Sequence, residues 1–222
     1  MSAVTEKVIV SKEIDIELES ETLKGELCIP AGAKGLVLFA HGSGSSRFSP
    51  RNKFVARTIQ EKGVATLLFD LLTPDEEELD RKTRHLRFDI GLLAQRLIAA
   101  TKWIGEVDET RELRIGYFGS STGGGAALVA AAELGEAVGA VVSRGGRPDL
   151  AGSALSMVTA PVLLIVGGND PTVIRLNNEA AGHMKCENEL RIIPNATHLF
   201  EEPGALESVA GIAAEWLREK IG

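Results

Sequence analysis

The chain has 222 residues, which is long enough for one α/β domain with a substantial buried core. Hydrophobic residues make up 44% and charged residues 25% of the chain, as is usual for soluble globular proteins. The formal net charge of −7 disfavours nucleic acid and anionic membrane surfaces as partners. No apolar run approaches the roughly 20 residues that cross a bilayer.

The N-terminus and the cysteines indicate the compartment. Residues 1–7 lack the basic start and apolar core of a signal peptide. Cys28 and Cys186 are far apart in the sequence and lack the spacing of a metal site. We therefore expect a cytoplasmic protein, as a monomer or homodimer, without a bound metal.

The first 70 residues predict a hairpin followed by two buried strands. Residues 7–19 and 23–29 alternate well enough for two strands joined by a polar turn, with a break of the first strand near Lys12 as one option. Continuous apolar runs at 35–40 and 64–69 are typical of strands buried on both faces. Between them, Ser49-Pro50 predicts the start of a helix.

Helices alternate with strands in the rest of the chain. Residues 85–104 carry apolar side chains at steps of three and four, which predicts an amphipathic helix. The remaining elements are predicted as strands at 113–118, 138–142, 162–166 and 190–193, with helices at 123–134, 172–184 and 206–217. Residues 71–84, acidic and then basic, form either a flap over the site or a solvated connection.

This order of elements predicts an α/β fold. Alternating strands and helices form a mostly parallel sheet covered on both faces, here with an antiparallel N-terminal hairpin. We find no linker, internal repeat or low-complexity tract, and therefore expect a single domain over residues 1–222. The stretch after the helix at 123–134 is too short for a large cap domain.

A serine lies between two glycines where a strand turns into a helix. In Gly119-Ser120-Ser121-Thr122-Gly123, Ser121 is the central residue and Ser120 the spacer. The pattern G-x-S-x-G in this context is typical of a nucleophile elbow, in which a strained turn exposes the serine hydroxyl. Side chains at the glycine positions would collide with the neighbouring strand and helix.

A serine nucleophile needs a general base, usually a histidine oriented by a carboxylate. Of the four histidines, His85 and His183 lie on predicted helices and are expected at the surface or in packing. His41 follows a buried strand, in a loop upstream of the elbow. His198 follows the last predicted strand and is the best candidate for the base.

The candidate carboxylate is Asp170, in Gly167-Gly168-Asn169-Asp170-Pro171 after a buried strand. Acids at strand ends lie on the same rim as the elbow in open parallel sheets. Asp70 also ends a strand, and Asp149 lies further into a loop, so both are rivals. The order Ser121, Asp170, His198 is that of the α/β-hydrolase triad.

The tetrahedral intermediate of acyl transfer needs donors for its oxyanion. The backbone N–H of Thr122, at the start of a helix, is one candidate. The second donor is expected in the loop His41-Gly42-Ser43-Gly44, from Ser43 or from Gly44, where glycines allow close approach of the backbone. His41 itself is then expected to hold this loop by hydrogen bonds.

These motifs make the chain resemble an α/β-hydrolase of the dienelactone-hydrolase-like group. The likeness extends from about residue 20 to the closing helix, and is strongest to the hydrolase portion found fused to phosphoribosyltransferase domains. It implies a three-layer α/β-hydrolase fold. Dienelactone hydrolases themselves use a cysteine nucleophile, so the serine at position 121 favours ordinary ester chemistry.

Arginines cluster near the loops expected at the rim of the site, at positions 47, 51, 84, 87, 144 and 147. A guanidinium suits a carboxylate or phosphate on a substrate. Our hypothesis is that Arg144 or Arg147 binds an anionic substrate group; the alternative is solvated charge, or pairing with the acidic run at 75–78.

The sequence thus predicts a serine hydrolase that cleaves small carboxylic esters through an acyl-enzyme, with no metal or organic cofactor. Its expected partner is a small-molecule ester. The same triad could serve a thioesterase, an acyltransferase or a small peptidase. A non-catalytic binding module is a further alternative, but binding alone does not require all three side chains.

Overall fold

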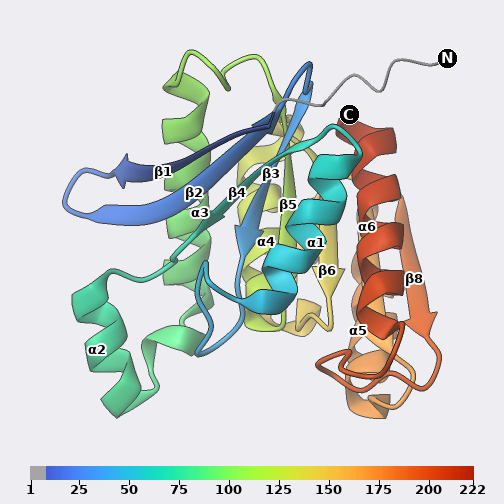
Figure 1. The fold of residues 1–222 in the computed structure, drawn as a ribbon. Helices are drawn as coiled ribbons and strands as arrows, with labels where there is room; N and C mark the ends of the chain where they lie inside the picture. Colours follow the sequence, from blue (N-terminus) through green and yellow to red (C-terminus); the bar gives the residue numbers. More distant parts are fainter. Residues whose placement is uncertain (1–8) are drawn as a thin grey trace, which may run out of the picture.

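The computed structural model describes residues 9–222, and these contain one eight-stranded sheet (Figure 1). Its strands are β1 (Ile9–Glu17), β2 (Thr22–Pro30), β3 (Gly35–Ala40), β4 (Ala65–Phe69), β5 (Arg114–Ser120), β6 (Val138–Arg144), β7 (Val162–Gly167) and β8 (Asn188–Ile193). They lie in the order β1-β2-β4-β3-β5-β6-β7-β8. The β1–β2 and β2–β4 pairs are antiparallel and the others are parallel. The predicted fold class is confirmed.

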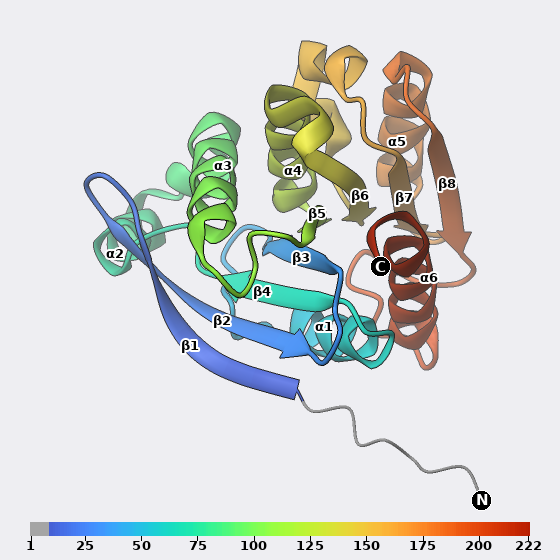
Figure 2. The same ribbon diagram turned by 90° about the horizontal axis from the view of Figure 1, so that it is seen from above.

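Helices cover both faces of the sheet (Figure 2). One face carries α1 (Pro50–Glu61) and α6 (Ala205–Ile221), and the other carries α3 (Ile90–Glu106), α4 (Thr122–Leu134) and α5 (Pro171–His183). Each layer has its own apolar core. Along β3, Leu36 and Leu38 pack toward the α3 and α4 side, whereas Val37 and Phe39 pack toward α1 and α6. This double burial explains the continuous apolar run of β3.

Several element boundaries differ from the sequence prediction. The first strand was predicted from residue 7; residues 7 and 8 lie outside the described residues, and β1 runs through Lys12 without a break. The helix predicted over 85–104 is interrupted at Asp89, after a single 3-10 turn at Leu86–Phe88. The Asp89 carboxylate accepts the Leu92 N–H at 3.0 Å and so starts α3 as an N-cap.

The segment at 71–84 contains a helix, α2 (Pro74–Thr83). The Thr73 hydroxyl accepts the Glu76 N–H, and the Glu76 carboxylate accepts the Thr73 N–H. This reciprocal pair is a capping box, readable in the sequence as Thr-x-x-Glu with proline at the first helical position. The helix lies beside the main body, near the β1–β2 hairpin (Figures 1 and 2).

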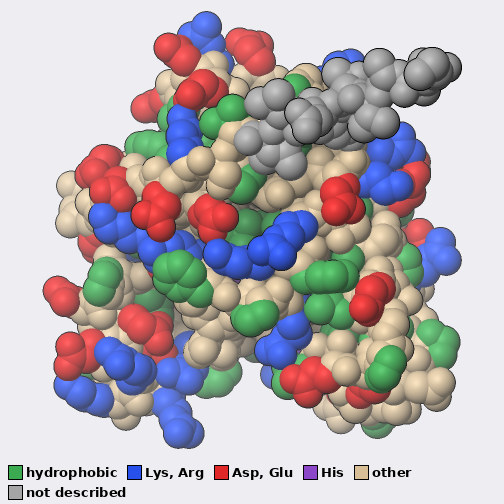
Figure 3. All heavy atoms as spheres, in the orientation of Figure 1, with side chains coloured by type: hydrophobic (Ala, Val, Ile, Leu, Met, Phe, Trp, Pro, Cys, Tyr) green, Lys and Arg blue, Asp and Glu red, His purple; other side chains and the backbone are tan. Residues whose placement is uncertain are grey.

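Charged side chains of both signs are interspersed on the face drawn in Figure 3. That face therefore has no broad region of one sign of the kind that attracts a polyanion. Within residues 9–222, no helix combines the length and the apolar character required to cross a membrane.

Candidate active site

The predicted elbow lies at the junction of β5 and α4. Because β5 ends at Ser120 and α4 begins at Thr122, Ser121 is the one residue between strand and helix. Its backbone has φ 52° and ψ −120°, a conformation that residues other than glycine rarely adopt. Ser121 remains partly accessible to solvent. This is the local geometry expected of a nucleophile elbow.

Close backbone approaches explain the two glycines of the elbow. A Cβ on Gly119 would lie 2.5 Å from the carbonyl oxygen of Gly123, and one on Gly123 would lie 2.1 Å from that of Ala40. Both distances are too short for any real side chain. A larger residue at either position would therefore push α4 away from β3 or β5, and the turn would change.

His198 and Asp170 lie in contact. The distance from His198 Nδ1 to Asp170 Oδ2 is 2.8 Å, and the other carboxylate oxygen accepts the Val173 N–H at 3.3 Å. Asp170 is therefore both the N-cap of α5 and the partner of the imidazole. With Nδ1–H donating to this carboxylate, Nε2 is the nitrogen that can accept a proton.

The segment that follows β6 links the serine to the histidine. Ser121 N–H donates to the Arg144 carbonyl at 3.2 Å, and Arg147 N–H donates to the Ser121 carbonyl at 3.0 Å. Between these two contacts, a Cβ on Gly145 would lie 3.4 Å from His198 Cε1. Ser121 and His198 thus both approach the segment at residues 144–147.

The rival acids are engaged with arginines. Asp70 accepts the Arg47 N–H at 2.8 Å and forms an ion pair with the Arg47 guanidinium. Asp149 binds the Arg147 guanidinium through two hydrogen bonds, of 2.8 and 2.7 Å. Arg144, the other arginine of the anion hypothesis, is buried at the end of β6.

Of the other three histidines, one is buried and two are exposed. His41 is buried; its Nε2 accepts the Leu71 N–H at 3.1 Å, and its Nδ1 lies 3.1 Å from the Gly42 carbonyl. Burial lowers the pKa of His41 below its ordinary value, so the ring is neutral and holds the loop by hydrogen bonds. His85 and His183 are exposed, before a 3-10 turn and at the end of α5.

The loop after β3 passes beside the elbow. A Cβ on Gly42 would lie 3.1 Å from Ser121 Cβ, and the Ser43 and Thr122 hydroxyl oxygens are 3.0 Å apart. Gly44 is exposed, with φ 66°. The candidate oxyanion donors, the N–H of Thr122 and that of Ser43 or Gly44, therefore belong to two segments that contact each other beside Ser121.

A buried ion pair, missed in the sequence, supports this loop. Asp80 of α2 has a side chain only 1% exposed, and it accepts Arg87 Nε at 2.6 Å and the Arg87 N–H at 3.0 Å. The Arg87 carbonyl in turn lies 3.4 Å from Ser43 Oγ, which donates to it. The two residues are seven positions apart, across a helix end and a turn, so no local pattern predicts the pair.

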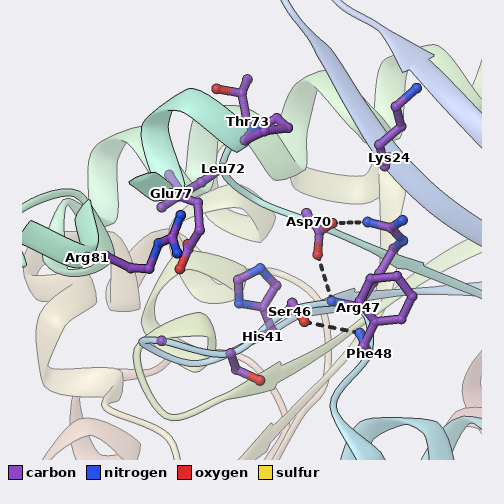
Figure 4. Close-up of a pocket in the computed structure, with 13 residues that line it drawn as sticks. Lys24, His41, Ser46, Arg47, Phe48, Asp70, Leu72, Thr73, Glu77 and Arg81 are labelled. Atoms are coloured by element: carbon purple, nitrogen blue, oxygen red, sulfur yellow. Dashed lines mark hydrogen bonds and ion pairs between the residues drawn. The ribbon is translucent and has the colours of Figure 1, made fainter. Parts of the chain in front are cut away.

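A cavity of about 350 Å³ lies between the loop after β3 and α2 (Figure 4). His41 lies at its centre in this view, with Arg47 and Asp70 on one side and Glu77 and Arg81 of α2 on the other. None of the three predicted catalytic side chains lines it. The cavity is thus a neighbour of the Ser121 site, and α2 forms one of its walls.

The arrangement can support nucleophilic catalysis. A strained serine, a histidine paired with a carboxylate, and backbone N–H groups at a helix start are the parts that acyl transfer requires. Among the described residues, no group of three or more His, Cys, Asp or Glu side chains is placed to hold a metal ion.

The chain is similar to several known proteins. Two curated Mycobacterium tuberculosis proteins, provisionally named phosphoribosyl transferases, are 50% identical over 221 residues. The match covers 100% of this chain and 49% of each relative, so the chain spans about half their length.

Among solved structures, a dienelactone hydrolase from Anabaena variabilis matches with a TM-score of 0.95 and 59% identity, over 96% of this chain and 99% of that one. Est1E from Butyrivibrio proteoclasticus shares the fold, with a TM-score of 0.78 at 19% identity, over 94% of this chain and 98% of that one. The model of the dienelactone hydrolase family matches residues 23–220. The chain therefore belongs to the dienelactone hydrolase family.

Proposed function

We propose that this protein is a serine hydrolase that cleaves small carboxylic esters through an acyl-enzyme. Ser121 attacks the ester carbonyl carbon while His198 Nε2 takes the hydroxyl proton. The C–O bond to the alcohol then breaks, and His198 returns the proton to the leaving oxygen. Water, deprotonated by the same nitrogen, releases the acid and restores Ser121.

The observation that carries the proposal is the 2.8 Å contact between His198 Nδ1 and Asp170 Oδ2, on the rim that also bears the strained Ser121. Asp170 fixes the orientation of the imidazole and stabilises its protonated form. The N–H of Thr122 and that of Ser43 or Gly44 stabilise the oxyanion. Family membership supports ester hydrolysis as the reaction class.

A fluorophosphonate probe tests the nucleophile. It should label the wild-type protein covalently, and the label should disappear in Ser121→Ala, with turnover of p-nitrophenyl acetate reduced by several orders of magnitude. Ser120→Ala is the matched control, because the Ser120 side chain is buried and its hydroxyl donates to Asn52 Oδ1 at 3.1 Å. Labelling that persists in Ser121→Ala would refute the assignment.

A panel of esters, thioesters and amides with varied acyl length tests the reaction class. Under the ester assignment, esters should give the highest kcat/KM. Amides should be slower because an amine leaving group needs more help from the acid than an alkoxide does, and thioesters should be slower because the site selects the ester group. Faster turnover of thioesters or amides would replace the ester assignment by a thioesterase or a peptidase. Transfer to an added alcohol in preference to water would indicate an acyltransferase.

A further inference from the structure

The segment at residues 144–147 contacts two of the three side chains of the proposed triad or their backbone. Its first carbonyl accepts the Ser121 N–H at 3.2 Å, and its last N–H donates to the Ser121 carbonyl at 3.0 Å. Between these bonds, a Cβ on Gly145 would lie 3.4 Å from His198 Cε1. A displacement of this segment would therefore change the position of the serine relative to the histidine.

Asn177 of α5 binds this segment. Its side chain is completely buried, and its amide nitrogen donates to the Gly146 carbonyl at 3.0 Å and to the Val173 carbonyl at 2.8 Å. Two carbonyl acceptors on this side fix the orientation of the amide. Asp170 is the N-cap of the same helix and contacts His198. The amide is thus a hydrogen bond between the helix that begins at the proposed acid and the segment that holds the serine.

Of the two amide bonds, only the one to Gly146 requires a side-chain donor. Within α5 the Val173 carbonyl also faces the backbone N–H of Asn177, four residues later, so the second bond is local to the helix. Gly146, in contrast, is buried and lies outside the helices and strands. A buried carbonyl needs a donor, and the Asn177 amide supplies one from a different element.

The segment is confined at Gly146 from a second side. A Cβ on this glycine would lie 1.8 Å from Ser143 Oγ, so the backbone fits only without a side chain there. The position of Asn177 is also costly for a polar group, because its Oδ1 is buried without a hydrogen-bond partner among the described residues. The bond to Gly146 is therefore the reason for an amide at this position.

We propose that Asn177 is a positioning residue that fixes the distance between Ser121 and the acid–base pair. It acts through Gly146 and does not touch the reacting atoms. The inference rests on the proposed serine-hydrolase function and adds the residue that keeps the nucleophile and the base in register. Asp170 begins α5 and His198 follows β8, so loss of the amide leaves their contact in place. Proton transfer from Ser121 to the imidazole is the step that becomes slower.

Asn177→Leu tests the positioning role, because leucine is similar in size to asparagine and cannot donate a hydrogen bond. With p-nitrophenyl acetate, kcat should fall about 10²-fold, as is usual for a misplaced reacting group. KM should stay within about threefold of the wild type, because the buried side chain does not contact the substrate. The rate of fluorophosphonate labelling at Ser121 should fall together with kcat. An unchanged kcat in the folded variant would overturn the proposal.

Asn178→Leu is the matched control. Asn178 is the next residue of α5, is exposed, and its amide donates to the Ile174 carbonyl at 3.1 Å. This is the same bond to the preceding helical turn that Asn177 makes. The substitution removes that local bond and leaves the bond to Gly146 in place, so kcat should stay within about twofold of the wild type. A loss of kcat as large as in Asn177→Leu would attribute the effect to the helix and contradict the proposal.

A second buried amide separates positioning from folding. Gln60 of α1 donates to the Thr66 hydroxyl of β4 at 2.6 Å, in a buried bond outside the segment at 144–147. Gln60→Leu and Asn177→Leu each remove the donor from a buried acceptor, so both variants should unfold at a lower urea concentration. Only Asn177→Leu should lower kcat about 10²-fold. An equal loss of kcat in Gln60→Leu would show a general effect of lost stability and overturn the proposal.

Amide hydrogen exchange separates this inference from the proposed function. The N–H groups of Ser121 and Arg147 donate across the contact between the elbow and the segment. Their exchange should accelerate about tenfold in Asn177→Leu and stay unchanged in Asn178→Leu. Faster exchange in a protein that hydrolyses no ester would keep the positioning contact and reject the serine-hydrolase function. Unchanged exchange at both groups in Asn177→Leu would reject the positioning role, even in an active enzyme.

Discussion

The two halves of the site are built from different interactions. On the β5–β8 side, the elbow and the Asp170–His198 pair are held by close backbone packing, a helix cap and a short hydrogen bond. On the β3–β4 side, ion pairs such as Arg47–Asp70 hold the loop and α2 in place. The first half holds the groups of the proposed triad, whereas the second gives the neighbouring cavity its walls.

This difference predicts different responses to substitution. In the β5–β8 half, Asp170 and His198 have a chemical task in the proposed mechanism, and a helix cap and backbone hydrogen bonds maintain the fold around them. The charged groups of the other half form ion pairs with each other, and a further pair joins Arg96 to Glu76 of α2 at 2.7 Å. We therefore expect substitutions in the first half to lower turnover, and those in the second to lower stability.

The largest effect on turnover, apart from loss of Ser121, is expected for Asp170→Asn. The amide oxygen can still accept the Val173 N–H at the start of α5, so the free energy of unfolding should change little. The imidazole of His198 loses its carboxylate and is held in the wrong tautomer. We expect kcat to fall about 10³–10⁴-fold, measured on p-nitrophenyl acetate beside urea unfolding.

Asp149→Asn and Asp70→Asn are the matched controls, since both acids were rivals of Asp170. Neither should lower kcat by more than tenfold, because their carboxylates bind arginines and not His198. If one of them reduced kcat as strongly as Asp170→Asn, the carboxylate of the triad would have to be reassigned.

In the β3–β4 half, Asp80→Ala should lower the stability of the fold. It leaves Arg87 without its buried partner, and Arg87 is itself only 18% exposed. We expect the free energy of unfolding to fall by about 3 kcal/mol, measured by urea denaturation, while kcat falls less than tenfold. Glu78→Ala, which removes an exposed pair with Lys82 on the same helix, should cost under about 1 kcal/mol.

The opposite results would contradict the expected difference between the two halves. A large loss of kcat in Asp80→Ala at unchanged stability would mean that the Arg87–Ser43 contact sets the oxyanion geometry directly. The loop after β3 would then have to be grouped with the β5–β8 half, whose substitutions are expected to lower turnover.

The sequence predicted what short motifs encode. The elbow, the strand runs and the Ser49 cap follow from neighbouring residues, and the structure places Asp170 and His198 in contact as their positions after strands indicated. The α2 helix was missed, although its capping box is local, because its acidic run has no apolar face. The Asp80–Arg87 pair depends on how the chain turns after α2, and the burial of Arg144 depends on packing between elements distant in the sequence. No local pattern contains that information.

The smallest expected effect concerns His41, the buried histidine between the two halves. Its folded-state pKa lies below the ordinary 6.5 because burial disfavours the charged ring. As the pH falls through 6.5, His41 takes up a proton in the unfolded chain but not in the folded chain. The free energy of unfolding therefore decreases as the pH falls below this value. The urea midpoint should therefore fall more between pH 7.5 and 5.5 in the wild type than in His41→Gln, whose amide can still accept the Leu71 N–H. Equal falls in both proteins would show that His41 titrates alike in the folded and unfolded states, and that the loop is less tightly closed than its hydrogen bonds indicate.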